Sequence, residues 1–405
     1  LSLVFVLASI GVSRASPLQQ AIDKAPSGAV IALGPGFYEG NIAISKPLTL
    51  RASGKGVVIH GDGTGSVITV TASYVTVDGL TIENSGPKHQ TVDAGITVRG
   101  ADNVKILRNR IRDCLFGINF EQTNRSVIED NDITSLPVSL GLKGDGIRLW
   151  YSHGNLIRMN RTRYVRDNVF WYSSANKIYE NSGADSRYSL HFMYADRNEI
   201  LSNDYRRNSV GIFLMFSQGS TLKRNFVADS TGPFCIGIGM KESSDVLVEE
   251  NQILYNARGF YLDSSPYQPG TFNTFRGNEI NFNTTAFLLH GTLLPSLFES
   301  NVFKGNIEDV ANDTPESKLE INTWRSNYWD NYEGFDRNDD GYGDIPHEQW
   351  MYADRIWSYL PAAKFFYASP VLDFMNFLWR LMPFSEPVLL ARDARPQIRE
   401  RGTEK

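Results

Sequence analysis

The sequence predicts an all-β right-handed parallel β-helix, a solenoid of coils about 22 residues long. Two kinds of repeated segment and a capping segment at the N-terminal end indicate this fold. Nine four-residue phrases begin with an apolar residue and end with Asn, and successive phrases lie 21 to 29 residues apart. A base period with insertions is typical of solenoids. The nine Asn residues are Asn109, Asn131, Asn160, Asn181, Asn203, Asn225, Asn251, Asn278 and Asn301.

Between these phrases lies a second kind of short apolar segment, for example at residues 117–120, 211–214 and 259–262. The segments of each coil alternate apolar and polar residues, as short strands do. Leucine-rich repeats share the period, but their Leu-x-x-Leu-x-Leu pattern is absent from this sequence. Asn tolerates the left-handed conformation, and its amide can hydrogen-bond to the Asn of the next coil. We therefore expect a ladder of Asn at one corner of the coils.

The segment before the repeats is a predicted cap. Residues 17–26 form a short amphipathic helical pattern with Pro17 in its first turn, and an apolar strand follows at 28–33. A coil buries its apolar face only by stacking, so the ends of a solenoid need covers. We divide the chain into a signal peptide remnant at 1–15, the β-helix at 16–310, an aromatic and acidic loop region at 311–354, and C-terminal amphipathic helices with a tail at 355–405.

The first twelve residues are mostly apolar, and the small-x-small site Ser13-Arg14-Ala15 follows them. This order is typical of the end of a secretory signal peptide, and the run is shorter than the roughly 20 apolar residues of a spanning helix. We expect an exported protein; a buried N-terminal strand is the alternative. The net charge of −5 argues against a nucleic-acid partner, because such partners require a basic face.

The two cysteines, Cys114 and Cys235, lie about five coils apart in the predicted stack. Coils stack at roughly 4.8 Å, so the two residues are separated by ~24 Å. That distance exceeds the limit of about 7 Å between the Cα atoms of a disulfide. We expect no disulfide and two buried thiols.

One candidate metal site combines sulfur and imidazole ligands. His191 and Met193 alternate onto one face of a strand, and Met215 follows Met193 by one 22-residue coil. Met240 follows 25 residues later, and we expect it in the same column. Thioether and imidazole groups suit Cu(I). The alternative is core packing, because Met fills irregular gaps.

A second candidate site is an acidic loop that could hold Ca²⁺. Asp336, Asn338, Asp340 and Asp344 occupy positions 1, 3, 5 and 9 of a calcium-loop pattern, with Gly at position 6. Position 12 is His rather than the usual Glu. A solvated acidic turn is the alternative.

A third group contains carboxylates and bases, namely Lys143, Asp145, Arg148, Arg166 and Asp167. Asp145 and Asp167 are 22 residues apart, which places them on one face if their coils stack in register. Clustered acids and bases abstract sugar protons in polysaccharide lyases and epimerases. The alternative is a set of paired charges that keeps a polar face soluble.

The C-terminal region contains a predicted amphipathic helix. Ser369 is a suitable N-cap, Pro370 is at the first helical position, and Pro383 ends the pattern. Nine of the thirteen residues at 370–382 are large and apolar. The helix would be roughly 20 Å long, too short for a bilayer core of about 30 Å. We expect association with a membrane surface or another protein; packing onto the β-helix as a cap is the alternative.

In combination, nine short motifs make residues 17–398 resemble the NosD family. They are Gln19-Gln-Ala-Ile-Asp-x-Ala-Pro, Gly144-Asp-Gly-Ile-x-Leu-Trp150, His191-x-Met-Tyr, Leu214-Met-Phe, Ser326-Asn-Tyr-Trp-Asp330, the loop from Asp336, Leu360-Pro-Ala-Ala-Lys364, Ser369-Pro and Asp393-Ala-Arg-Pro396.

The resemblance implies a periplasmic β-helix protein, not an enzyme, that matures the copper centres of nitrous-oxide reductase. It implies as partners an ABC transporter, composed of a permease and a cytoplasmic ATPase, a small copper chaperone lipoprotein, and the reductase. It also favours copper at His191, Met193 and Met215. A secreted polysaccharide lyase or epimerase remains the alternative, although such an enzyme has no need of the C-terminal region.

Overall fold

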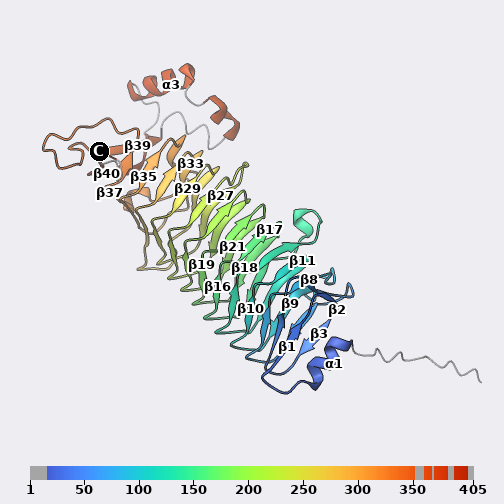
Figure 1. Cartoon of the computed structure of the whole chain (residues 1–405). Coiled ribbons are helices and arrows are strands. Elements are labelled where there is room, and N and C mark those ends of the chain that lie inside the picture. The colour runs from blue at the N-terminus through green and yellow to red at the C-terminus, as the bar shows by residue number, and fades with distance from the viewer. Residues whose placement is uncertain (1–15, 315, 352–359, 367–368, 382–386, 400–405) are drawn as a thin grey trace, which may run out of the picture.

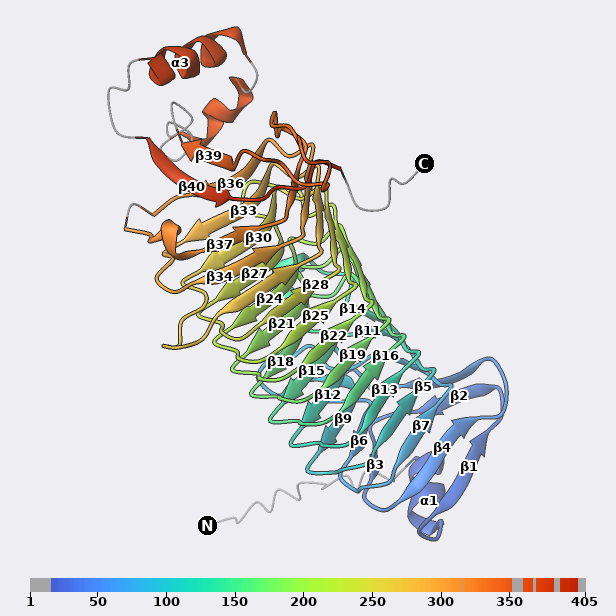
Figure 2. The same cartoon turned by 90° about the vertical axis from the view of Figure 1, so that its left-hand side faces the viewer.

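Each full coil contributes one short strand to each of three sheets, which form the predicted right-handed solenoid. Neighbouring coils pair in parallel, and only the C-terminal strands β39 and β40 of the described chain pair antiparallel. The computed structural model describes residues 16–314, 316–351, 360–366, 369–381 and 387–399. Figures 1 and 2 show the coils stacked in one direction, from the blue N-terminal end to the orange and red C-terminal end. The predicted signal peptide remnant lies outside the described residues.

The sheets are named A, B and C in the order in which the chain reaches them. Sheet A contains β1 (Ala29–Leu33), β4 (Leu48–Ala52), β7 (Thr76–Asp78), β10 (Lys105–Leu107), β13 (Val127–Glu129), β16 (Leu156–Arg158), β19 (Lys177–Tyr179), β22 (Glu199–Leu201), β25 (Thr221–Lys223), β28 (Leu247–Glu249), β31 (Asn273–Arg276), β34 (Ser296–Glu299), β37 (Thr323–Arg325), β40 (Val388–Asp393) and β39 (His347–Met351). Sheet B contains β2 (Gly36–Glu39), β5 (Val57–His60), β8 (Thr81–Glu83), β11 (Arg110–Cys114), β14 (Asp132–Ser135), β17 (Arg161–Arg163), β20 (Ser182–Ala184), β23 (Asp204–Arg206), β26 (Phe226–Ala228), β29 (Gln252–Leu254), β32 (Glu279–Asn281), β35 (Val302–Lys304) and β38 (Tyr328–Trp329). Sheet C contains β3 (Ile42–Ile44), β6 (Ile68–Val70), β9 (Ala94–Arg99), β12 (Phe116–Glu121), β15 (Ile147–Trp150), β18 (Asp167–Trp171), β21 (Tyr188–Met193), β24 (Val210–Met215), β27 (Ile236–Lys241), β30 (Arg258–Asp263), β33 (Thr285–His290) and β36 (Glu308–Asn312).

The core lies between the three sheets and consists of stacked identical or similar side chains. Phe170 and Phe192 stack with their ring centroids 5.0 Å apart, and Phe260 and Phe287 stack at 4.5 Å. These separations follow the spacing of neighbouring strands. Because side chains alternate along a strand, the residues on either side of each core position point to the outer face.

The predicted Asn ladder is present and continues beyond the nine phrases. At a typical rung, the Oδ1 atom of Asn203 accepts hydrogen bonds from the backbone N–H and the Nδ2 of Asn181, at 2.9 and 3.0 Å. The left-handed residue is the one before the Asn, for example Ser202 with φ 55°. The expectation that the Asn itself supplies this conformation is wrong, because the chain bends one residue earlier and thereby turns the Asn side chain into the column.

Both ends of the stack are capped. At the N-terminal end, α1 (Pro17–Lys24) buries Leu18 and Ile22, and the Ser16 hydroxyl accepts a hydrogen bond from the Gln19 N–H at 3.2 Å. This confirms the predicted helix. At the C-terminal end, β40 pairs with the last full coil, and Asp393 takes the place of the next Asn in the ladder.

Two predicted boundaries differ from the structure. Parallel pairing continues past residue 310, since β37 pairs with β34 and β38 pairs with β35. Residues 388–393 form a strand rather than part of a helical tail. Asp393, 66 residues after Asn327, covers the open end of the stack. No local sequence pattern predicts a contact between residues so far apart in the chain.

Besides α1, four short helical segments of the described residues lie outside the coils. They are η1 (Leu140–Leu142), η2 (Leu319–Ile321), η4 (Pro361–Phe366) and α3 (Pro370–Leu381). The Ser369 hydroxyl accepts a hydrogen bond from the Leu372 N–H at 3.4 Å, which confirms the predicted start of α3; Pro383 lies outside the described residues. Within the described parts of the chain, no helix has the length and apolar character needed to cross a membrane.

The cysteines are both free, as expected. Cys114 is buried, and burial raises the pKa of its thiol to about 12. Cys235 is only partly buried, so the expectation of a buried thiol is wrong for this residue. It precedes β27 at the start of a coil, where the chain is still at the surface.

Candidate metal site on the outer face of sheet C

The structure brings His191 and Met215 together on the outer face of sheet C. His191 lies on β21 and Met215 on the neighbouring strand β24, and the His191 Nε2 atom is 3.2 Å from the Met215 Sδ atom. Met193 is in register with Met215 across the same pair of strands. The side chain of His191 is 14% exposed, so the site is shielded but open to solvent. This is the arrangement that the 22-residue spacing predicts.

A buried carboxylate lies behind the imidazole ring. Asp167 is 3.7 Å from the His191 Nδ1 atom, which is itself buried and makes no hydrogen bond. Arg187 makes two hydrogen bonds to Asp167. Burial alone would raise the pKa of Asp167, but the bonds from Arg187, with the nearby imidazole, hold it below its usual range.

The contact of 3.2 Å between Nε2 and the sulfur allows either role for this nitrogen, depending on the tautomer of His191. The negative charge of Asp167 on the Nδ1 side favours a proton on Nδ1. The lone pair of Nε2 then points to the sulfur of Met215. In metal sites, a histidine commonly presents one nitrogen to the metal while a carboxylate beside the other nitrogen fixes the orientation of the ring. An imidazole nitrogen and a thioether side by side therefore form a suitable pair of ligands for Cu(I).

Aromatic rings lie around the pair. The ring of Tyr188 stacks on that of His191 with centroids 4.7 Å apart, and Trp171 is in register with Met193. The Phe213 ring covers Gly239 so closely that a Cβ atom at 239 would lie 2.3 Å from it. Sequence reasoning did not find these neighbours or Asp167 as part of this site. Aromatic residues at one position of successive coils are the signal that could have indicated them.

The expected place of Met240 in the ligand column is wrong. Met240 is 0% exposed and packs in the core, in register with Leu214 and Leu262. The residue opposite Met215 is Lys241, 26 positions later. A difference of one residue turns a side chain to the other face of the sheet, so Met240 cannot reach the column.

The remaining donors do not form another centre. Among the described residues, no three His, Cys, Asp or Glu side chains gather in an arrangement that could hold a metal ion. The imidazole and thioether pair falls outside that class of sites, because a thioether is not among these donors and the pair contains only one histidine.

The two carboxylates of the alternative enzyme site, Asp145 and Asp167, form ion pairs with arginines. Asp145 is 2% exposed, and its Oδ1 atom is 2.9 Å from Arg166 Nη2. Burial raises the pKa of Asp145 to about 6 despite this ion pair. Asp167 is held by Arg187 as described above.

The other two basic residues of this set, Lys143 and Arg148, donate hydrogen bonds to neutral groups. Lys143 donates a hydrogen bond to the Leu136 carbonyl oxygen, and Arg148 donates to Asn119 Oδ1 at 2.8 Å. The five residues therefore do not form one open acid–base group.

The acidic loop uses its side-chain oxygens internally. The carboxylate of Asp336 accepts hydrogen bonds from the N–H groups of Asp340 and Gly341, at 3.2 and 2.8 Å. Asp344 accepts from the Arg337 N–H at 2.8 Å, and Arg395 donates to Asp340 at 2.9 Å. The acidic side chains share one loop, but their carboxylates do not gather into a group that could hold a metal ion, and Arg395 neutralises one of them. Calcium binding here stays a prediction.

If this loop binds Ca²⁺, a chelator is expected to lower the melting temperature of the calcium-containing protein. A bound ion stabilises the folded state by about 2.7 kcal/mol when its concentration is 100 times the dissociation constant. Melting with and without chelator, followed by circular dichroism, measures the effect. The variant Asp336→Ser should melt alike in both conditions. An unchanged curve for wild-type protein that was shown to contain calcium would contradict the prediction.

Comparison with known proteins identifies the family. The family model described as "Periplasmic copper-binding protein (NosD)" matches residues 133–334, which include β21 and β24 with the imidazole and thioether pair. A second model, "Right handed beta helix region", matches residues 51–157. The chain belongs to the NosD family. The match to the NosD model ends before the acidic loop and α3, so it covers neither of them.

Two relatives extend the similarity over most of the chain. A "Probable ABC transporter binding protein NosD" of Pseudomonas aeruginosa is 27% identical over 429 aligned residues, which cover 98% of this chain and 94% of that protein. A protein of the same name from Stutzerimonas stutzeri is 28% identical and covers 87% of this chain and 83% of its own length. Both relatives are thus named as binding proteins.

Solved structures share the fold of this NosD chain at low identity. The A-module of mannuronan C-5 epimerase AlgE6 from Azotobacter vinelandii has a TM-score of 0.57 at 18% identity, and covers 76% of this chain and 93% of its own. The surface adhesin PfbA of Streptococcus pneumoniae has a TM-score of 0.56 at 13% identity, and covers 71% and 86%. An enzyme and an adhesin match equally well, so these similarities show the β-helix alone.

Proposed function

We propose that this protein is a periplasmic accessory factor that binds Cu(I) transiently during maturation of the copper centres of nitrous-oxide reductase. The observation that carries the proposal is the contact between His191 Nε2 and Met215 Sδ at 3.2 Å on an outer face of the solenoid. In this proposal, a copper chaperone lipoprotein delivers the ion, the reductase receives it, and an ABC transporter of permease and ATPase is the membrane partner.

The ligands are suited to transfer rather than to permanent storage. Thioethers bind copper without losing a proton, and a neutral imidazole does the same, so binding and release need no proton exchange. Asp167 supplies a negative charge behind His191 without being a ligand itself. The partial exposure of His191 leaves a path for a partner to approach the ion.

Helix α3 is the proposed docking element for the membrane partner. It covers about 18 Å and exposes apolar side chains at helical spacing, with Phe374 59% and Phe377 56% exposed. Val371, Leu378 and Leu381 are exposed as well. An exposed apolar surface of this kind is typical of a binding site on another protein or at a membrane surface. In Figure 1 the helix stands beyond the last coils, at the opposite end from α1.

Polar substitutions on α3 test the proposal better than removal of the tail does. Deletion from residue 355 onward would also remove Asp393, which ends the Asn ladder. The double variant Phe374→Ser and Phe377→Ser should keep the fold but lose co-purification with the permease. Reductase made beside it should contain less copper.

The variant Phe37→Ser is the matched control, because Phe37 is 76% exposed on β2 at the far end of the stack. It should behave as wild type in both measurements. If the α3 variant still co-purifies with the permease and yields reductase with full copper, α3 is not the docking element. If reductase made without this chain at all has full copper, the proposed function itself is wrong.

The alternative of a polysaccharide lyase or epimerase has less support. Its candidate carboxylates, Asp145 and Asp167, are buried and held by arginines. The similar epimerase structures share only the fold with this chain.

A further inference from the structure

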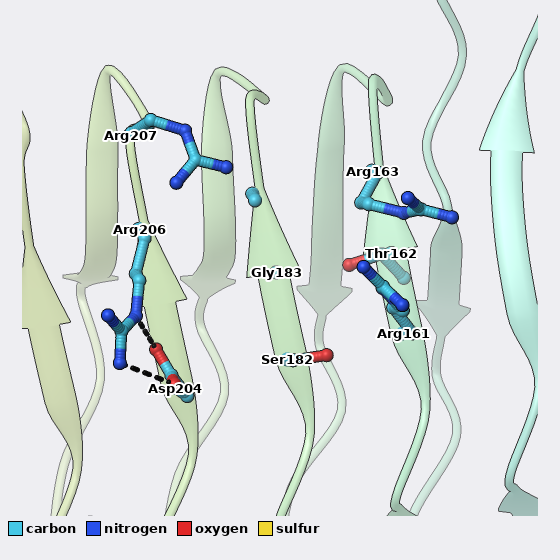
Figure 3. A pocket seen from close by; sticks show the side chains of 9 residues that line it. Arg161, Thr162, Arg163, Ser182, Gly183, Asp204, Arg206 and Arg207 are labelled. Carbon is cyan, nitrogen blue, oxygen red and sulfur yellow. Dashed lines mark hydrogen bonds and ion pairs between the residues drawn. The ribbon is translucent and has the colours of Figure 1, made fainter.

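A hollow lined by arginines lies on the outer face of sheet B, one face away from the imidazole and thioether pair. The strand at its floor, β20, carries only Ser182, Gly183 and Ala184. Its neighbours β17 and β23 carry longer side chains at the same register, so Ala184 lies between Arg163 and Arg206. Because the side chains of β20 are small and those of the strands on either side are large, a hollow of about 270 Å³ lies above β20 (Figure 3).

The arginines that border this hollow differ in how their charge is used. Arg206 makes two hydrogen bonds to Asp204, at 2.7 and 2.9 Å, and Arg207 makes two to Asp185, at 2.9 and 3.0 Å. Figure 3 shows the pair of Arg206 and Asp204 closed on one side of the hollow. Each of these two guanidinium groups uses two of its five N–H donors on a carboxylate, which neutralises its charge.

Arg161 and Arg163, on the other side, retain free donors. Arg161 has no ion-pair partner among the described residues. Arg163 reaches Asp132 with one Nη atom at 3.3 Å, but its Nε–H is buried and has no hydrogen-bond acceptor. The second Nη atom of Arg163 is not buried and makes no hydrogen bond to the described residues, so it remains a free donor.

The charge balance also favours an anion. Four arginines line the hollow, and even after subtraction of Asp204, Asp185 and Asp132 the local charge is +1. The whole chain carries −5, so this patch is opposite in sign to the average surface. Guanidinium groups bind oxyanions through paired N–H donors, which gives the contact both energy and direction.

We propose that this hollow is a binding site for a tetrahedral oxyanion of the sulfate or phosphate class. Arg161 and Arg163 project from the same face of β17, two residues apart, and supply the free N–H donors. The short side chains of Ser182 and Ala184 let the anion approach the level of the sheet. The Ser182 hydroxyl, in register with Arg161, is a further donor.

The test is binding of inorganic sulfate and phosphate to the full chain, measured by titration calorimetry at constant ionic strength in chloride. Two variants should each weaken binding at least tenfold. Arg161→Gln combined with Arg163→Gln removes the free donors, whereas Ala184→Leu fills the hollow without changing the charge.

The control is Arg276→Gln, which alters an arginine on sheet A that is paired with Glu299. It should bind sulfate as wild type does. The proposal is overturned if wild-type protein shows no saturable binding above chloride, or if either test variant retains wild-type affinity. Titration with acetate tests whether the site prefers a tetrahedral anion. If this planar anion binds as tightly as sulfate, the site is not specific for tetrahedral oxyanions.

Discussion

Replacement of Asn203 by Leu is expected to lower the free energy of unfolding by roughly 4 kcal/mol or more, since several buried polar groups lose their partners at a cost of about 1–3 kcal/mol each. Leu has the same branching and the same number of side-chain heavy atoms as Asn, so it is the apolar residue closest in shape. The Oδ1 atom of Asn203 accepts two hydrogen bonds from Asn181, and its Nδ2 donates to the Ile178 carbonyl and to Asn225 Oδ1. All these groups lie inside the stack, where water cannot replace the lost bonds.

The change is measured as the shift of the denaturant midpoint, followed by circular dichroism. Gln252→Leu is the matched control, because Gln252 is exposed on β29 and its amide donates only to Glu279. That variant should change stability by less than about 0.5 kcal/mol. Equal midpoints for Asn203→Leu and Gln252→Leu would mean that the ladder contributes nothing beyond packing.

The double variant Met193→Leu and Met215→Leu is expected to lower the affinity for Cu(I) at least about tenfold. Leu keeps the volume of Met, so stability should fall by less than about 1.5 kcal/mol, while both sulfur ligands are lost. Competition with a chromogenic Cu(I) chelator measures the affinity. Reductase matured beside this variant should lack copper.

The structure also orders the single variants. Met215→Leu should have the larger effect, because its Sδ atom is the one 3.2 Å from His191 Nε2. Met240→Leu is the control, since Met240 is buried in the core on the opposite face of the sheet. If the double variant and Met240→Leu bind Cu(I) with equal affinity, the outer methionines are packing residues and the copper site is elsewhere.

The repeat, the ladder and the N-terminal cap were predictable from the sequence alone. Each depends on local patterns: an Asn such as Asn203 recurs once per coil, apolar residues alternate within each strand, and Pro17 begins an amphipathic helix. The contact of His191 with Met215 was also predictable, because the coils from β21 to β24 carry no insertion and keep the 22-residue spacing. Within such regular coils, position in sequence determines position in space.

Only the tertiary structure decided the features that depend on irregular coils or on distant segments. The coil after Met215 is longer than 22 residues. The position of its extra residues places Lys241, and not Met240, on the outer face. Asp393 bonds to the last Asn of the ladder, and Arg187 pairs with Asp167. Both contacts are between residues on different coils or segments, so the local sequence does not predict them. The physical reason is that alternation along a strand turns a one-residue shift into a change of face. The position of an insertion within a coil, which sets that shift, is determined by packing against the neighbouring coils.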